Sequence, residues 1–114
     1  MAAGNSRDRE TRHPQVSELT LQRVLDAVVD PVRRSILQQL NDRGEDISCG
    51  NFILPVARST ATHHFNVLRE AGLITQYYKG TSHMNTLRRD DLNTAFPGLL
   101  DALLQASITQ KENP

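Results

Sequence analysis

Residues 59–80 read STATHHFNVLREAGLITQYYKG, and within this stretch the spacing of apolar residues changes from helical to alternating. Ser59 can cap a helix, and Gly72 stands where helices commonly end in a left-handed residue. Beyond that glycine, LITQYYK and SHMNTLR flank KGTS, which predicts a β-hairpin with Gly80 in its turn. The stretch therefore predicts a capped helix followed by a hairpin over residues 74–88.

A helix over residues 59–72 would have one apolar face and one polar face. At about 100° per residue, the expected buried side holds Ala61, His64, Phe65, Leu68 and Ala71. The opposite side holds Ser59, Thr62, His63, Asn66 and Glu70, with Thr60 and Arg69 at its flanks. The two adjacent histidines therefore point about 100° apart and cannot bind one metal ion together.

The sequence before this stretch predicts two helices and then a short one. Ser17 is expected to cap the first helix, whose apolar residues recur at intervals of three and four. Asp30 followed by Pro31 is typical of a helix start, and Gly44 is typical of a helix end. The segment EDISCGNFILP predicts a short helix near residues 48–53.

The segment after the hairpin, LRRDDLNTAFPGLLDALLQASI, returns to helical spacing, and Pro97 is expected to open its last part. Burying one leucine side chain contributes about 1.5–3 kcal/mol, and this leucine-rich surface is wider than one small domain can cover. Pairing of two chains about a two-fold axis would bury it. The predicted dimer interface lies on the first and last helices, at Leu21, Val24, Leu25, Val28, Leu99, Leu100, Leu103 and Leu104. The alternative is that the leucines at 99–104 pack inside a single chain.

The composition bounds the class of protein. The chain has 114 residues, of which 38% are apolar and 4% aromatic, without tryptophan, which favours one mainly helical domain with an aliphatic core. We expect this domain over residues 17–109, between a flexible tail at 1–16 and a short tail at 110–114. No apolar run approaches the roughly 20 residues of a membrane span. The first residues lack the apolar core of a secretory signal, and Cys49 is the only cysteine, so a soluble cytoplasmic protein is expected.

The order of predicted elements is that of a winged helix-turn-helix: a mainly α fold with a small β-hairpin wing. In this arrangement the helix before the hairpin packs one face on its own domain and presents the other to the major groove of DNA. The polar side of the 59–72 helix offers small and flat groups that can reach base edges and phosphates. The formal net charge is zero, but residues 58–89 carry five cationic side chains against one acidic one, an excess of four.

Three segments, DPVRRSILQQL, STATHHFNVLREAGLI and the hairpin ending in LRRDDL, resemble the arsenical-repressor-type (ArsR-type) family of bacterial transcription regulators over about residues 19–107. The resemblance implies a nucleoid-associated homodimer that reads an imperfect inverted repeat in double-stranded DNA, most simply as a repressor. Carried over position by position, it implies base or backbone contacts at Ser59, Thr60, Thr62, His63 and Asn66. Backbone contacts are implied at Arg58 and Arg69, and at the wing residues Lys79, Thr81 and His83.

Two metal sites associated with that family lack their ligands in this chain. The segment ISCGN offers the single thiol of Cys49 where a Cys-x-Cys pair would stand, and the last helix contains no histidine. Because zinc and similar ions generally require three or four good ligands, we expect no metal and no other cofactor. Cys49 is then either a small buried apolar residue or a redox or ligand sensor that would make the regulator thiol-responsive.

Two further classes of function compete with DNA binding. A small hydrolase or metalloenzyme would have to use Cys49, His63, His64 and His83, but the sequence shows no nucleophile paired with an oriented base. A winged-helix module that binds another protein instead of DNA remains an alternative. Neither the operator sequence nor the effector can be deduced from the sequence.

Overall fold

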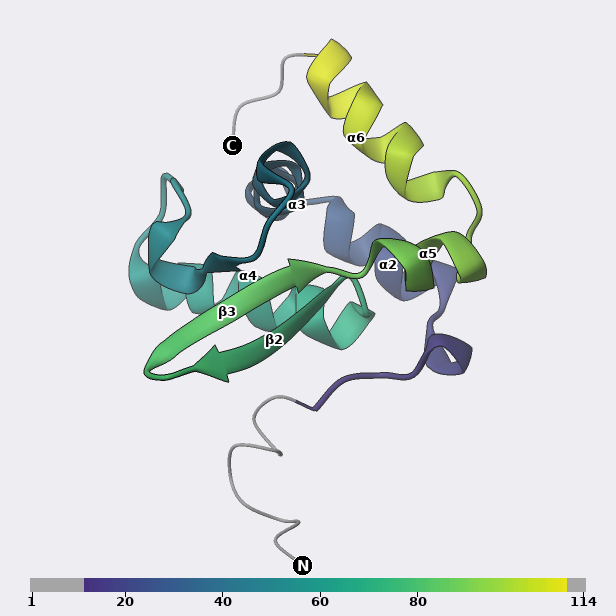
Figure 1. Ribbon diagram of the computed structural model, residues 1–114. Helices are drawn as coiled ribbons and strands as arrows, with labels where there is room; N and C mark the ends of the chain where they lie inside the picture. The colour runs from purple at the N-terminus through teal and green to yellow at the C-terminus, as the bar shows by residue number, and fades with distance from the viewer. Residues whose placement is uncertain (1–11, 111–114) are drawn as a thin grey trace, which may run out of the picture.

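The computed structural model describes residues 12–110 and places them in a helical domain with a small antiparallel sheet at one side (Figure 1). The elements in chain order are η1 (Val16–Glu18), α2 (Leu21–Val28), α3 (Pro31–Arg43), β1 (Ile47–Ser48), η2 (Cys49–Asn51), α4 (Arg58–Ala71), β2 (Ile74–Lys79), β3 (Ser82–Leu87), α5 (Arg89–Ala95) and α6 (Leu99–Thr109). The predicted fold class, mainly α with a β wing, is confirmed.

The sheet has three strands in the order β1-β3-β2, and both pairings are antiparallel. The hairpin register runs from Ile74 opposite Leu87 to Lys79 opposite Ser82, which leaves a two-residue turn. Gly80 lies in that turn with φ +64, a conformation that glycine adopts without steric cost. The predicted hairpin is therefore confirmed, with β1 as an additional strand on the far side of β3.

The segment after α3 differs from the predicted short helix. Ile47 and Ser48 pair with Asn85 and Met84 of β3, and only residues 49–51 form a single 3-10 turn. The predicted helix is thus confirmed only over residues 49–51. It is shorter than expected because β3 offers an open edge to the residues before it, and pairing with that edge satisfies their backbone groups.

Two predicted helix starts are also wrong, while a third is confirmed. Ser17 lies inside the 3-10 turn η1, and Thr20 caps α2 by accepting a hydrogen bond from the Arg23 N–H at 3.2 Å. Gln15 and Glu18 bond each other across η1, and the extended backbone of Leu19 separates that turn from α2. For α4 the N-cap residue is Ala57, one position before Arg58, so Ser59 is already helical.

The start of α3 follows the prediction. Asp30 Oδ1 accepts hydrogen bonds from the backbone N–H groups of Val32 at 2.7 Å and Arg33 at 3.3 Å, and Pro31 occupies the first helical position. Gly44 ends the helix in a left-handed conformation. After the hairpin, Pro97 and Gly98 separate α5 from α6, as expected from the proline.

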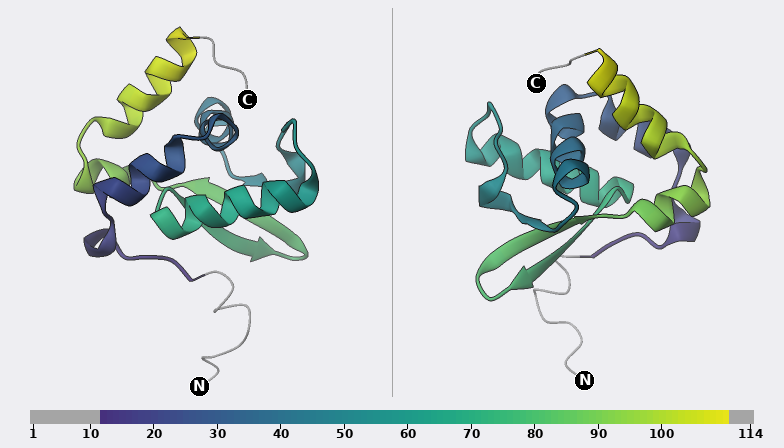
Figure 2. Two further views of the ribbon diagram at one scale, coloured as in Figure 1. Left: turned by 180° about the vertical axis from the view of Figure 1, so that it is seen from behind. Right: turned by 45° about the horizontal axis from the view of Figure 1, so that its top comes forward.

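The core lies between the helices and one face of the sheet. Figures 1 and 2 show α4 lying across the face of the sheet, with α2 and α6 at the end away from the hairpin tip. Among the most buried residues are aliphatic side chains of α3, α4 and β2, namely Ile36, Leu37, Leu68 and Ile74, each at most 1% exposed. Phe65 of α4 packs on Phe52 with 5.2 Å between ring centroids. Helix α4 is thus anchored by its apolar face.

Gly72 joins α4 to the wing in a left-handed conformation, with φ +87, and a Cβ atom there would lie 2.1 Å from Leu19 Cδ2. We expect Gly72→Ala to lower the free energy of unfolding by about 2–3 kcal/mol, because a left-handed residue with a Cβ costs about 1–2 kcal/mol and Leu19 must also move. Gly44→Ala is the matched control, since Gly44 is left-handed with no atom within 4 Å of the added carbon. Urea denaturation that gives equal losses for the two variants would contradict the role of Leu19.

Candidate nucleic-acid interface

The two predicted faces of α4 are confirmed by burial. His64, Phe65, Leu68 and Ala71 are buried, and Ala61 is half-buried. The opposite face leaves Ser59, Thr60, Thr62, His63 and Glu70 exposed and Asn66 half-buried. The helix therefore presents a polar surface without acidic side chains over its first two turns, and its acidic residue, Glu70, comes only in the last turn.

The N-terminus of α4 has the character of an anion-binding end. Its cap residue Ala57 supplies no side-chain acceptor to the first-turn N–H groups, and no acidic residue stands in that turn. Arg58, Ser59 and Thr60 are all exposed there. Because a helix N-terminus carries partial positive charge and outward-pointing N–H groups, this end suits a phosphate.

Arg69 is not a surface cation, although the sequence analysis placed it among backbone contacts. Its side chain is 13% exposed. The Nη1 atom donates to Asn66 Oδ1 at 2.9 Å and to Gln76 Oε1 at 2.8 Å. The guanidinium therefore joins α4 to β2 through Nη1, while its Nη2 atom lies 3.8 Å from Glu70 Oε2.

A chain of buried amides continues from Arg69 through the sheet, and sequence reasoning missed it. Gln76 Nε2 donates to Asn85 Oδ1 at 2.8 Å, and Asn85 Nδ2 donates to the Ile47 carbonyl at 3.1 Å. Gln76 is 2% exposed and Asn85 is fully buried. A usable signal existed: Gln76 stands two residues after buried Ile74, so strand alternation places its side chain on the inner face.

Cys49 lies beside this amide chain and is half-buried. Its Sγ atom accepts from Asn85 Nδ2 at 3.3 Å and, more distantly, from Gln76 Nε2 at 3.8 Å. Burial raises the pKa of the thiol, against the smaller opposing effect of these bonds. A protonated thiol is a poor nucleophile, so this environment does not activate Cys49. The sulfur lines a cleft of about 160 Å³ together with Arg58, Thr62, Asn66 and His83.

The predicted contact residues of the wing differ in their exposure to solvent. Lys79 and Thr81 are exposed at the hairpin tip. The ring of His83 is half-buried and stacks on Tyr78, with 4.5 Å between centroids and 6° between planes. The tip therefore offers the Lys79 ammonium and the hydroxyls of Thr81 and Ser82 to a partner, while the stack stiffens the hairpin behind them.

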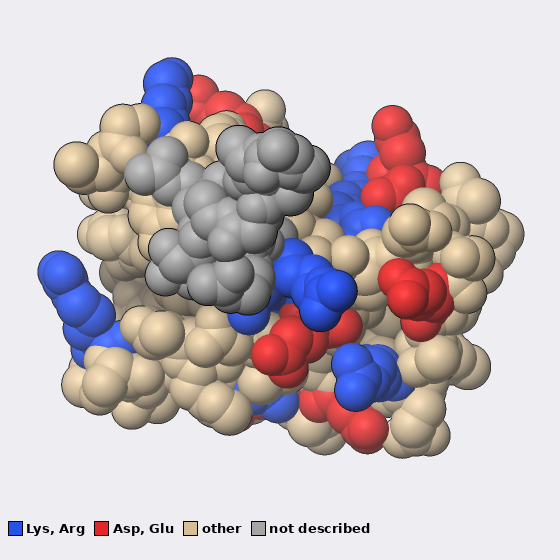
Figure 3. All heavy atoms as spheres, turned by 90° about the horizontal axis from the view of Figure 1, so that it is seen from below, with Lys and Arg blue, Asp and Glu red and all other residues tan. Residues whose placement is uncertain are grey.

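The basic excess of residues 58–89 does not form a continuous patch. Arg88 is 8% exposed and bonds Asp91 at 2.9 Å, and Arg89 bonds Asp101 at 2.5 Å. With Arg69 also enclosed, Arg58 and Lys79 are the exposed cations of this segment. Figure 3 shows the same pattern on the face seen from below, where basic and acidic side chains stand beside each other.

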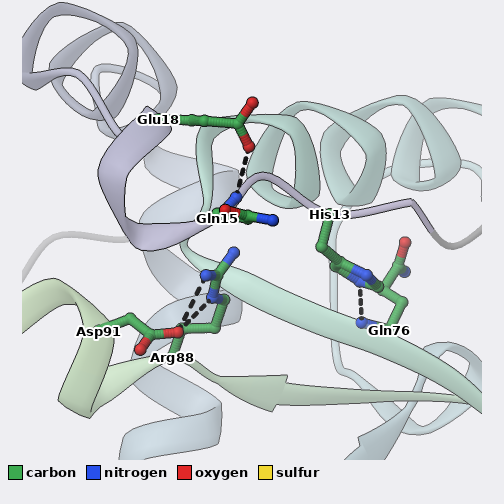
Figure 4. A network of polar contacts seen from close by, with 6 residues as sticks. All are labelled: His13, Gln15, Glu18, Gln76, Arg88 and Asp91. Carbon is green, nitrogen blue, oxygen red and sulfur yellow. Dashed lines mark hydrogen bonds and ion pairs between the residues drawn. The ribbon is translucent and has the colours of Figure 1, made fainter.

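His13 falls in the predicted tail, yet it lies against the wing. Its Nε2 atom accepts a hydrogen bond from the backbone N–H of Gln76 at 2.8 Å, at the outer edge of β2 (Figure 4). Burial lowers the pKa of His13, and Arg69, Arg88 and His83 lower it further. The imidazole is therefore held neutral, as an acceptor must be.

His64 is also held neutral, on the buried side of α4. Its Nδ1 atom lies 3.0 Å from Arg33 Nη1, and because a guanidinium can only donate, the ring nitrogen accepts. Burial lowers the pKa of His64 most strongly, although Asp30 acts in the opposite direction. Arg33 also donates from Nε to the Ala27 carbonyl at 2.6 Å, so it connects α2, α3 and α4.

These two histidines should make stability depend on pH. Their pKa values in the folded chain lie below the ordinary 6.5. Between those lowered values and pH 6.5, the unfolded chain therefore binds more protons than the folded chain. The stabilisation is complete above pH 6.5 and is lost as the pH falls through the lowered pKa values. We expect the free energy of unfolding to rise from pH 5 to pH 7, and to rise less in the double variant His13→Gln, His64→Gln. An unchanged pH profile of urea denaturation would contradict this.

The residues considered for catalysis are not brought together. Cys49 and His83 line one cleft, but His63 is exposed and His64 faces Arg33. Among residues 12–110, no group of three or more His, Cys, Asp or Glu side chains is arranged to hold a metal ion. Within the same residues no helix has the length and apolarity to cross a membrane.

The residues expected at a dimer interface divide into three groups by their exposure in the single chain. Val24, Val28, Leu100 and Leu104 are at most 5% exposed inside the single chain, which leaves little surface for a partner. Leu99 and Leu103 are partly buried. Leu21 is 49% and Leu25 41% exposed, and Val29 and Ile108, which the sequence analysis did not include, are 72% and 52% exposed.

The fold and the polar face of α4 together define a winged helix-turn-helix protein, and comparisons with known proteins agree. A family model described as "Helix-turn-helix domain" matches residues 28–77. The HTH-type transcriptional regulator YceK of Bacillus subtilis (strain 168) is 33% identical over 82 residues, which cover 70% of this chain and 82% of that protein. The transcriptional repressor SdpR of the same organism is 32% identical over 76 residues, 61% of this chain and 82% of that protein.

A solved structure gives the same result. The ArsR-like transcriptional regulator from Rhodococcus sp. RHA1 superposes with a TM-score of 0.60 at 26% identity, over 82% of this chain and 92% of that one. The chain therefore belongs to the ArsR family of winged helix-turn-helix transcriptional regulators. These are DNA-binding proteins, and the family is not enzymatic.

Proposed function

We propose that this chain is a repressor that binds an imperfect inverted repeat as a homodimer, with α4 in the major groove of each half-site. One observation carries the proposal: α4 exposes a polar face without acidic side chains over its first two turns, while Phe65 and Leu68 anchor the other face in the core. A helix positioned in this way can enter a groove without moving relative to its own domain. The likeness to the repressor SdpR supports repression.

The contacts divide by chemistry. Thr62, His63 and Asn66 point outward from the middle of α4 and read base edges. Arg58, Ser59 and Thr60 at its N-terminus bind phosphate, and Lys79, Thr81 and His83 of the wing bind backbone beside the groove. Arg69 contributes by positioning Asn66.

The proposed dimer uses the apolar side chains that the single chain leaves exposed. Leu21 and Leu25 are exposed on α2, Val29 directly follows that helix, and Ile108 is exposed on α6. Leu99 and Leu103 remain proposed members of the interface, because they are only partly covered. A two-fold axis through this surface would place two α4 helices to read half-sites about one helical turn apart.

A titration of selected DNA fragments tests the proposal. We expect binding of two chains per fragment, which weakens steeply between 50 and 200 mM salt because phosphate contacts release counterions. The variant Thr62→Ala, His63→Ala should raise Kd by about tenfold or more, since good base contacts contribute about 1–3 kcal/mol each. The matched control Gln105→Ala, Thr109→Ala changes two exposed residues of α6 and should bind as the unmodified chain does.

Two outcomes would contradict the proposal. Equal Kd values for the α4 and α6 variants would show that the exposed face of α4 does not contact the DNA. A chain that ignores every DNA fragment at 50 mM salt but retains protein partners would be a protein-interaction module instead.

A further inference from the structure

The hydrogen bonds between the buried amides beneath α4 all run in one direction, and the groups at both ends of this network determine that direction. At one end the Ile47 carbonyl can only accept, so the Asn85 atom facing it is the NH2 group. Asn85 then offers its oxygen to Gln76 Nε2, which leaves Gln76 Oε1 to face Arg69. At the other end the guanidinium of Arg69 can only donate, which agrees with an oxygen at that place.

The same guanidinium nitrogen sets the orientation of Asn66. Arg69 Nη1 donates to Asn66 Oδ1 at 2.9 Å and to Gln76 Oε1 at 2.8 Å. If the Asn66 amide were turned over, its NH2 group would face the guanidinium, a donor against a donor. Rotation of Arg69 away from Asn66 would also break its bond to buried Gln76. The carbonyl oxygen of Asn66 is therefore held toward the protein.

The outward part of Asn66 is consequently its NH2 group, on the face of α4 that carries Thr62 and His63. An asparagine that recognises adenine directs both amide atoms at the base, with its oxygen accepting from N6 and its nitrogen donating to N7. Guanine instead sets the acceptors O6 and N7 side by side, and thymine offers the acceptor O4. An amide that faces the groove with its donor alone finds only acceptors on the edge of a keto base. On adenine it can bond N7, but the neighbouring N6 amino group is left without the acceptor that Asn66 Oδ1 has given to Arg69.

We propose that Asn66 is a specificity-determining residue that selects guanine or thymine over adenine at one position of each half-site. Arg69 is the positioning residue, and Gln76 and Asn85 hold Arg69 from below. This inference rests on the proposed DNA-binding function and adds to it the chemical class of the base that is read.

Selection of bound fragments from a random pool, with the unmodified chain and with Asn66→Ala, tests the base preference. We expect one position per half-site to hold guanine or thymine with the unmodified chain and to lose its preference in Asn66→Ala. Placing adenine there should raise the Kd of the unmodified chain by about tenfold or more. Adenine at the position that depends on Asn66, or no position that depends on it, overturns the inference.

Two further variants test the orientation itself. Asn66→Asp keeps an oxygen for Arg69 but has no donor, so its preference should move from the keto base toward cytosine, whose N4 group donates. Arg69→Met releases the Asn66 amide, so adenine should become tolerated at the same position, with circular dichroism confirming that the variant folds. Unchanged preferences in both variants overturn the role of Arg69. If the unmodified chain selects no DNA at all, the proposed function fails instead, so the two failures are distinguishable.

Discussion

Replacing Phe65 with alanine is expected to lower the free energy of unfolding by about 3–5 kcal/mol, the usual cost of deleting a buried aromatic side chain. Phe65 is 3% exposed, and its ring packs on that of Phe52 at 5.2 Å. The substitution removes both the apolar surface and the ring contact, and a cavity remains between α4 and the segment that precedes it. Since small domains have only about 5–15 kcal/mol of total stability, this loss is large.

The measurement is urea denaturation followed by circular dichroism, with Thr62→Ala as the control. Thr62 lies on the opposite, exposed face of the same helix and bonds only the Arg58 carbonyl, so its replacement should change stability by no more than about 0.5 kcal/mol. Similar effects of the two substitutions would show that α4 is not held by its apolar face. The proposed reading of DNA would then lose its rigid support.

Asn85→Ala is expected to cost about 2–4 kcal/mol, although it removes no large apolar surface. The side chain accepts from Gln76 Nε2 and donates to the Ile47 carbonyl, and both partners are buried. Each buried polar group left without a partner costs about 1–3 kcal/mol. The variant therefore loses these two hydrogen bonds, the longer bond to Cys49 Sγ, and one side-chain contact between β3 and β1.

Asn51→Ala is the matched control, because it removes the same amide from an exposed position in η2. Its denaturation midpoint should stay close to that of the unmodified chain. An Asn85→Ala variant as stable as this control would mean that water replaces the lost partners. The Ile47 carbonyl would then no longer determine the orientation of the amides that lead to Gln76 and Arg69.

Local patterns in the sequence were sufficient for the parts of the fold whose geometry is repeated along the chain. The spacing of Phe65, Leu68 and Ala71 predicted which face of α4 is buried, and the alternation around Gly80 predicted the hairpin. Asp30 and Pro31 marked a helix start that the structure confirms. These signals work because a helix and a strand each impose a fixed angular period on consecutive side chains.

Only the tertiary structure decided which distant groups meet. Strand β1 forms because the backbone groups at the edge of β3 pair with it. Thr20, and not Ser17, caps α2 because Gln15 and Glu18 close a separate turn before that helix. Arg69 looks like any surface cation in the sequence, yet it lies between Asn66 and Gln76. No local period encodes such contacts, because their energy appears only when packed elements bring together residues that are far apart in the chain.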